Sequence, residues 1–300
     1  MYQEHFNLTR EPFSIAPDPA FLYLSDSHNE ALSHLIYGLS HGGFIMISGE
    51  VGTGKTTVLR NLLNSIPSKT DVAFILNPRL TAIELLETIC EEFSLKEPDQ
   101  PSQTIKQYIN SLNKFLREND NLDRSAVLII DEAQNLSASV LEQIRLLTNI
   151  ETDSKKLLRI ILIGQPELEE MLSRTELRQL AQRITARYRL NPLNRGETKT
   201  YIQHRLQVAG TESIILKDSA IDTVYKISKG IPRLINLLCD RAMLGAYALD
   251  LNEVSSSIIR QSRKEVFGIH QTKSQPNFSI TLFMIALIIA ASTLFLHDYS

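Results

Sequence analysis

The chain has 300 residues, of which 43% are hydrophobic and 22% charged, and its formal net charge is −3. These values exclude a disordered or fibrous chain and allow one large or two medium folded domains. The small net charge indicates no overall attraction to nucleic acid, although it does not exclude a local basic face. Cys90 and Cys239 lie far apart in apolar helical stretches, so we expect buried thiols in a reducing compartment rather than a disulfide.

Residues 1–26 form an aromatic, proline-containing N-terminal segment. This segment does not begin with a basic region followed by an apolar core, so we expect no cleavable signal peptide. Residues 11–15 are too rich in turn formers for a core strand, and we expect their apolar side chains to cover an edge of the site described next. A helix is predicted over residues 27–40, with Ala31, Leu35 and Leu39 on one face.

The most specific motif of the chain is Gly-Glu-Val-Gly-Thr-Gly-Lys-Thr at residues 49–56, which matches the phosphate-binding loop G-x-x-x-x-G-K-[ST]. An apolar run of strand length precedes it at 44–48, and a segment with helical spacing follows at 57–63, as this loop requires. Lys55 is predicted to reach the β- and γ-phosphates and Thr56 to bind Mg²⁺ through its hydroxyl. We therefore predict that the chain binds ATP and Mg²⁺. The residues predicted to contact the nucleotide here are Gly49, Glu50, Val51, Gly52, Thr53, Gly54, Lys55, Thr56 and Thr57.

Strands and helices alternate after this loop, up to residue 193. This alternation predicts an α/β domain over residues 27–193, with a mostly parallel sheet covered on both faces. A polar connector is expected at 96–103. Further strands are predicted at 71–76, 126–130 and 157–163, and helices at 81–93 and 102–116.

Two acids and an amide follow the predicted strands in this domain. Asp131 and Glu132 come directly after the strand at 126–130. An acid at the carboxyl end of a strand beside a phosphate loop can hold the Mg²⁺ shell, and we give this role to Asp131. Glu132 is predicted to orient and deprotonate the attacking water. Gln165 ends the next strand and is predicted to sense the γ-phosphate or to help position water.

The segment 177–189 is rich in arginine and, in our prediction, precedes another strand. A guanidinium group here would suit the γ-phosphate bound by a neighbouring subunit, because an arginine finger offsets charge that develops in the transition state. Beyond Asn194 the strand pattern stops, and an all-α lid domain is predicted over 194–267. Arg233 follows a proline at the start of one of its helices and is expected to move onto the phosphates. The predicted lid helices lie near 195–209, 218–228, 232–249 and 252–266.

A polar linker over 268–278 leads to a nearly uninterrupted apolar run at 280–296. Seventeen residues at ~1.5 Å each reach about 26 Å, which is just enough to cross a thin hydrocarbon core. Bases precede the run and Asp298 follows it, so the positive-inside rule places the larger N-terminal part in the cytoplasm. We predict a single-pass helix at 279–296 in the inner membrane, followed by a short tail at 297–300. A buried C-terminal helix is the alternative, but the run lacks the polar face that such a helix shows to solvent.

Taken together, these features resemble the AAA+ ATPases over about residues 27–265. The phrase Tyr2-x3-Phe6-x-Leu8-x3-Pro12-Phe13-x3-Pro17-Asp18-Pro19-x-Phe21, followed by Glu30-Ala31-Leu32 and the phosphate loop, is similar to the general secretion pathway protein A family. The resemblance implies a membrane-bound ATPase that forms a homo-oligomeric ring or part-ring. It also implies a partner protein of the inner membrane, with which the ATPase places the outer-membrane secretin through the peptidoglycan. Family members often carry a periplasmic peptidoglycan-binding domain, and whether one follows here is left open.

The same resemblance implies a role for each candidate residue. Lys55 and Thr56 correspond to Walker A, Asp131 and Glu132 to Walker B, and Gln165 to sensor 1. Arg183 corresponds to the arginine finger, with Arg178 as the competing choice, and Arg233 corresponds to sensor 2.

These observations favour an ATP-hydrolysing enzyme that drives assembly or remodelling of a secretion or pilus machine. The alternative is a nucleic-acid-associated ATPase switch of the transposition or replication type, which shares the loop, the sensors and the lid. A membrane helix has no obvious use in that role, so we do not expect nucleic acid as a partner. A nucleotide-binding scaffold with little turnover is a third possibility, which the intact pair of acids disfavours.

Overall fold

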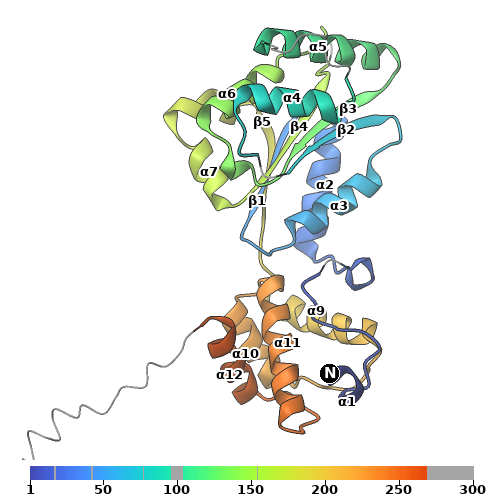
Figure 1. Cartoon of the computed structure of the whole chain (residues 1–300), viewed down its shortest axis with the longest axis vertical. Helices are drawn as coiled ribbons and strands as arrows, with labels where there is room; N and C mark the ends of the chain where they lie inside the picture. The colour runs from blue at the N-terminus through green and yellow to red at the C-terminus, as the bar shows by residue number, and fades with distance from the viewer. Residues whose placement is uncertain (17, 42, 77, 96–103, 154, 269–300) are drawn as a thin grey trace, which may run out of the picture.

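The computed structural model describes residues 1–16, 18–41, 43–76, 78–95, 104–153 and 155–268. In this part of the chain, an α/β lobe and a helical lobe meet at a narrow waist (Figure 1). The predicted membrane helix at 279–296, its tail and all but the first residue of the predicted linker lie outside the described residues. No helix in the described part is both long and apolar enough to cross a bilayer.

Five parallel strands form the sheet of the α/β lobe, in the order β2-β3-β4-β1-β5. The predicted parallel sheet is therefore confirmed. Strand β1, which leads into the phosphate loop, lies between β4 and β5, and β4 separates it from β3. The strands are β1 Phe44–Gly49, β2 Thr70–Ile75, β3 Ser125–Ile130, β4 Leu158–Gly164 and β5 Ile184–Leu190.

The central strands are apolar at almost every position because both faces of the sheet are buried. In β1, Phe44 and Met46 point into one core, while Ile45 and Ile47 point into the other. Helices α2 Asp26–His41 and α3 Lys55–Ser65 cover the second of these faces. The first face is covered by α4 Ala82–Glu92, α5 Ile105–Asn121, α6 Ala138–Leu147, α7 Pro166–Leu172 and α8 Arg178–Ala181.

Helix α6 was not predicted, although its buried residues Val140, Leu141, Ile144 and Leu147 have helical spacing. Ser137 begins this helix by accepting a hydrogen bond from the N–H of Val140. Together with the short helix η2 Ala133–Asn135, it fills the stretch between the acid pair and β4.

The prediction of a strand after the arginine-rich segment 177–189 was wrong, because β5 occupies the second half of that segment. Strand β5 lies at an edge of the sheet, where Ala186 and Tyr188 pack toward α2 and the alternate residues are exposed. The exposed positions hold Thr185, Arg187 and Arg189. Polar residues on one face of an edge strand are ordinary, and here they concealed the strand.

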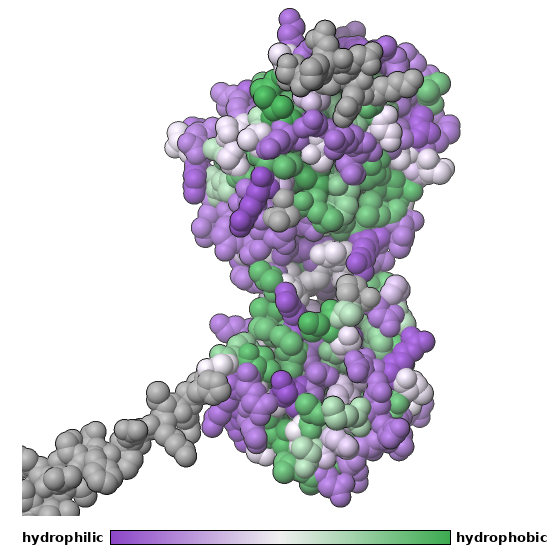
Figure 2. Space-filling model, in the orientation of Figure 1, coloured by the Kyte–Doolittle hydropathy of each residue, from purple (hydrophilic) through white to green (hydrophobic). Residues whose placement is uncertain are grey.

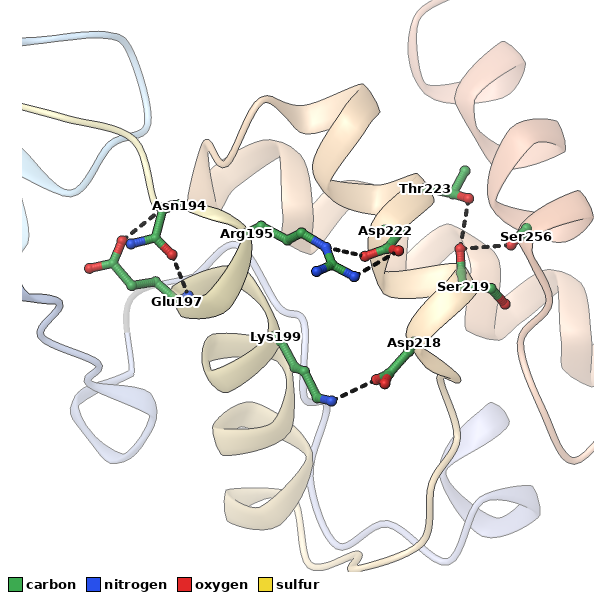
Figure 3. A network of polar contacts seen from close by, with 9 residues as sticks. All are labelled: Asn194, Arg195, Glu197, Lys199, Asp218, Ser219, Asp222, Thr223 and Ser256. Atoms are coloured by element: carbon green, nitrogen blue, oxygen red, sulfur yellow. Dashed lines mark hydrogen bonds and ion pairs between the residues drawn. The ribbon is translucent and has the colours of Figure 1, made fainter.

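The helical lobe consists of α9 Arg195–Val208, α10 Asp218–Ser228, α11 Pro232–Ala248 and α12 Ser256–Val266. All four were predicted, although α12 begins later than expected because Ser255 is its N-cap. Polar contacts join α9 to α10 and α10 to α12 (Figure 3). The Arg195 guanidinium donates to Asp222 at 2.6 and 2.9 Å, and Lys199 pairs with Asp218 at 2.7 Å. These pairs are mainly exposed, so each contributes little to the stability of the lobe.

The N-terminal segment packs into the core of the helical lobe through its aromatic residues. Of the apolar residues expected at the edge of the nucleotide site, Ile15 lines the pocket described below, whereas Phe13 is only 1% exposed and lies among the lid helices. Tyr2 donates to Asp240 of α11 at 2.5 Å, and Thr9 donates to the Ala209 carbonyl at 3.0 Å. Residues 1–16 and 18–21 therefore pack with the helical lobe, and they include the short helices α1 Tyr2–His5 and η1 Pro19–Phe21.

Candidate nucleotide site

A pocket of about 610 Å³ lies at the waist, between the carboxyl edge of the sheet and the helical lobe. Its volume is typical of sites for small molecules. Figure 2 shows a mixed surface at this waist, with hydrophilic and apolar residues side by side, and a broader apolar area on the face of the α/β lobe above it. The walls come from the N-terminal segment, the phosphate loop, α3 and the lid. Lining residues include Tyr23, His28, Lys55, Thr56, Glu132 and Arg233.

The phosphate loop leaves β1 and enters α3 through two glycines in the left-handed region, Gly52 at φ +83° and Gly54 at φ +105°. A side chain on Gly52 would also come within 2.6 Å of the Arg233 Cβ atom, so the loop and the lid approach too closely for one. Thr53 closes the turn by donating through Oγ1 to the Glu50 carbonyl at 2.9 Å. The N-terminus of α3 thus begins at the loop, which is the arrangement that binds anions.

The Lys55 ammonium lies under the loop and is 7% exposed. It donates to the carbonyls of Gly49 at 2.7 Å and Glu50 at 3.0 Å. Burial lowers the pKa of Lys55, while the carboxylates of Glu132 and Asp131 act in the opposite direction. The nearby acids therefore favour a charged lysine at the position where the loop would hold phosphate.

The two acids follow β3 and differ in their surroundings. Asp131 is 6% exposed, and burial raises the pKa of its carboxyl group. Its Oδ1 accepts from the N–H of Glu132 at 2.9 Å. Glu132 has a backbone φ of +52°. Residues other than glycine seldom adopt this left-handed conformation, and those that do often lie at functional sites. This turn directs the Glu132 side chain into the pocket.

The Glu132 carboxylate is held by two amide groups. Its Oε2 accepts from Gln134 at 2.5 Å and from Gln165 at 2.9 Å, and the Gln165 N–H donates to the Gln134 side chain at 3.1 Å. Burial alone would raise the pKa of Glu132, but the two amides and the Lys55 charge outweigh it and hold that pKa below its usual value. Glu132 is thus an oriented, ionised carboxylate. Gln134 was missed by the sequence analysis, although it lies two residues after Glu132.

The residues predicted to bind Mg²⁺ are Thr56, through its hydroxyl, and Asp131, through its carboxylate. Mg²⁺ is commonly bound through one or two carboxylates, with waters and substrate phosphates completing its shell. Thr56 lines the pocket, and Asp131 follows the strand next but one to β1. No cluster of three or more metal-binding side chains occurs among the described residues. Binding of Mg²⁺ by Thr56 and Asp131 stays a prediction, and of the two only Thr56 is among the residues that line the pocket.

The lid brings Arg233 to the loop, because Arg233 is the second residue of α11 and its N–H donates to the Gly52 carbonyl at 3.3 Å. One turn later on α11, Asn236 also lines the pocket. Its side-chain oxygen accepts from Tyr201 at 2.9 Å, and Tyr201 accepts from Arg205 at 2.9 Å. Asn236, Tyr201 and Arg205 were not predicted as site residues, and no sequence motif marks them.

The two candidate arginine fingers lie away from the pocket of their own chain. Arg183 precedes β5, at the amino edge of the parallel sheet, whereas the pocket lies at the carboxyl edge. Its guanidinium donates to the Thr148 hydroxyl at 2.6 Å. Arg178 begins α8 and is exposed. The fold therefore gathers Lys55, the acids, Gln165 and Arg233, but neither of these arginines.

A family model described as AAA domain matches residues 38–172. General secretion pathway protein A of Aeromonas hydrophila is 47% identical over 291 residues, which cover 97% of this chain and 53% of that protein. Cell division control protein 18 of Schizosaccharomyces pombe is 28% identical over 210 residues, covering 67% of this chain and 35% of that protein. The chain thus spans about half the length, or less, of these curated relatives.

Several solved structures share the fold. Cdc6p from Pyrobaculum aerophilum superposes with a TM-score of 0.63 at 18% identity, covering 84% of this chain and 71% of that one. A chain of Drosophila ORC bound to DNA gives a TM-score of 0.65 at 19% identity, covering 87% and 66%. The RuvB branch migration motor of Thermotoga maritima gives 0.51 at 18% identity, covering 81% and 69%. At such identities the likeness establishes the architecture alone.

Proposed function

We propose that this chain, an AAA+ P-loop ATPase of the general secretion pathway protein A type, is anchored in a membrane. In this proposal it uses ATP to drive the assembly or remodelling of a secretion or pilus machine. The observation that supports this proposal best is the 47% identity along 97% of the chain. The position of Lys55, Glu132 and Arg233 around one pocket supports ATP turnover in particular.

In the proposed reaction, the phosphates lie between the loop and the lid. Lys55 exchanges its two loop carbonyls for phosphate oxygens, and Arg233 approaches from the N-terminus of α11. Mg²⁺ held by Thr56 and Asp131 would neutralise charge on the phosphates. Glu132 accepts a proton from the attacking water, with its carboxylate kept in place by Gln134 and Gln165. By this proposal, Gln165 also reports the state of the nucleotide to α7, of which it is the N-cap residue.

We propose that the working form is a homo-oligomer, a ring or part-ring, in which Arg183 of one subunit completes the site of its neighbour. Arg183 lies at the edge of the sheet opposite to its own pocket, so a cis role would require a rearrangement of the fold. A neighbour that places its pocket against this edge would receive the guanidinium without any such change. Arg178, which is exposed nearby, is the competing choice.

The proposed location is the inner membrane, with the ATPase domain in the cytoplasm and the apolar run 280–296 as the anchor. The relative from Aeromonas hydrophila supports a role in a secretion pathway through its name. By this proposal, an inner-membrane protein of the same pathway is the partner, and the energy of ATP acts on a protein assembly.

The proposal is tested by restoring secretion in cells from which the gene has been deleted. The wild-type chain should restore secretion, whereas Lys55→Ala, present at the same level in the membrane fraction, should not. Lys69→Ala is the matched control, because Lys69 is an exposed lysine on the same lobe whose ammonium pairs with Asp123 at 3.5 Å. Restoration by Lys55→Ala would show that ATP binding is not needed for this function.

A nucleic-acid-associated switch is the second candidate. It shares the fold with a structure determined bound to DNA, but the net charge of −3 gives this chain no general attraction for a phosphate backbone. One measurement distinguishes the two candidate functions. Binding of duplex DNA by the intact chain, with a salt dependence that reports several phosphate contacts, would favour this second candidate.

A further inference from the structure

The imidazole of His28, on α2, lies directly under the phosphate loop. It is 3% exposed, and its Nε2 atom lies 3.0 Å from the Thr53 carbonyl oxygen. A Cβ atom on Gly54 would lie 2.4 Å from the same nitrogen. The ring thus occupies the space beneath the peptide bond that joins Thr53 to Gly54, and it explains why position 54 has no room for a side chain.

The contacts of the other ring nitrogen identify the tautomer. Nδ1 lies 3.3 Å from the Ser25 backbone nitrogen and 2.6 Å from the Ser25 hydroxyl. A backbone N–H can only donate, so Nδ1 accepts and carries no proton. In a neutral ring the proton is then on Nε2, which donates it to the Thr53 carbonyl.

We propose that His28 is a positioning residue of the nucleotide site, whose neutral imidazole holds the Thr53–Gly54 peptide in the orientation that binds phosphate. In a planar trans peptide the C=O and N–H groups point in opposite directions. When the Thr53 carbonyl points down onto His28, the Gly54 N–H must therefore point up, away from the ring. This inference rests on the proposed function, because it concerns how the same loop binds ATP.

The position of His28 also links the loop to the chain segment that enters α2. Ser25 precedes this helix, is 3% exposed, and holds Nδ1 through both its backbone and its side chain. The preceding residues Phe21 and Tyr23 line the pocket from the side of the lid. A movement of this segment would therefore reach the loop through one hydrogen-bonded ring.

Protonation would break this arrangement. An imidazolium carries a proton on Nδ1, which would face the Ser25 N–H. Burial lowers the pKa of His28, and a hydrogen bond to the Thr53 carbonyl and the charge of Glu197 on α9 act in the opposite direction. The ring contacts on the loop and before α2 come from the uncharged groups of Thr53, Gly54 and Ser25. Because the pKa of His28 is lowered, the ring stays neutral at pH values somewhat below the usual histidine pKa of about 6.5, and binding that depends on the neutral ring should weaken only at still lower pH.

Two substitutions in the full-length chain separate the two nitrogens. The amide nitrogen in His28→Gln can take the place of Nε2, whereas His28→Asn reaches only the place of Nδ1. We expect His28→Asn to weaken binding of ATP with Mg²⁺ about tenfold, and His28→Gln to change it by less than about threefold, as measured by titration calorimetry. His34→Asn is the control, because His34 is an exposed histidine on the same helix. Equal affinities of the Asn and Gln variants at pH 7.5 would overturn the proposal.

A pH series gives a test that does not depend on the Asn variant folding. The ratio of ATP affinities of wild type to His28→Gln should be constant near pH 7 and should fall at pH values well below about 6.5, because only the wild type can gain a proton at this position and burial lowers its pKa. A ratio that stays constant down to the lowest pH at which both proteins remain folded would overturn the proposal. Failure of the proposed function looks different, since wild type and Lys55→Ala would then bind ATP equally well or not at all.

Discussion

Replacing Glu132 by glutamine tests the chemical assignment of the site most directly, because the structure predicts that the change removes a proton acceptor and little else. The Glu132 Oε2 atom accepts two hydrogen bonds, from the amides of Gln134 and Gln165. A glutamine at position 132 can present its own side-chain oxygen to the same two donors. The amide of Gln134 need not turn, and its oxygen remains available to the Gln165 N–H. The loop, the lid contact and ATP binding should therefore persist.

The expected loss of turnover follows from the role given to the carboxylate. A well-placed general base contributes about 10²- to 10⁴-fold to a rate, so Glu132→Gln should reduce ATP turnover at least ~100-fold. The Lys55→Ala variant should behave differently from Glu132→Gln. It removes the cation that faces the phosphates, so it should abolish ATP binding. Binding and hydrolysis are thus expected to separate between these two residues.

Phosphate release under saturating Mg²⁺ and ATP measures the turnover, and calorimetric titration measures the binding. Glu170→Gln serves as the control for the loss of a negative charge, because Glu170 is an exposed acid on α7 near the site. Turnover of Glu132→Gln above about a tenth of the wild-type rate would remove Glu132 from the mechanism, since a lost base costs more than that. Loss of ATP binding in this variant would refute the view that the two amides simply exchange partners.

Three further predictions concern the assembly, the anchor and the waist. The Arg183→Ala variant should have no ATPase activity by itself but should regain part of it when mixed with the Glu132→Gln variant, because a mixed interface combines an intact arginine finger with an intact general base. If mixtures that assemble together recover no ATPase activity, the finger is another residue. The intact chain should resist carbonate extraction from membranes, whereas Ile288→Arg should release much of it, because a charge at the centre of a spanning helix costs about 2.5–3.5 kcal/mol on insertion scales. Gly230→Ala should lower the free energy of unfolding by more than ~2 kcal/mol in denaturant titrations, since its Cβ atom would lie 1.8 Å from the Leu193 carbonyl oxygen at φ +76°. Wild-type stability of that last variant would mean that the waist adapts easily.

Local patterns were enough to predict several parts of this protein correctly. The buried strand at 126–130 could be predicted because a strand covered on both faces is apolar at consecutive positions. The lid helices could be predicted from their apolar periodicity, and the start of α11 from Pro232. In each case the information lies within about ten neighbouring residues.

Strand β5 and the place of Phe13 could not be predicted in this way. Arg187 and Arg189 are compatible with a strand only because β5 lies at an edge, and the position of a strand in a sheet is not written in its own residues. Phe13 is buried among lid helices whose core residues lie about 180 to 245 positions further along the chain.

The sequence by itself determined which chemical groups are present and the order in which strands deliver them: the loop with Lys55, then Asp131 and Glu132, then Gln165. Only the tertiary structure decided that Gln134 and Gln165 hold the Glu132 carboxylate, that His28 lies under Thr53, and that Arg233 lies against Gly52. The physical reason is that these contacts have lengths of about one hydrogen bond, whereas the chain that separates the partners is up to about 180 residues long. Strand order and lobe packing bring them together, and those depend on the burial of apolar surface across the whole chain.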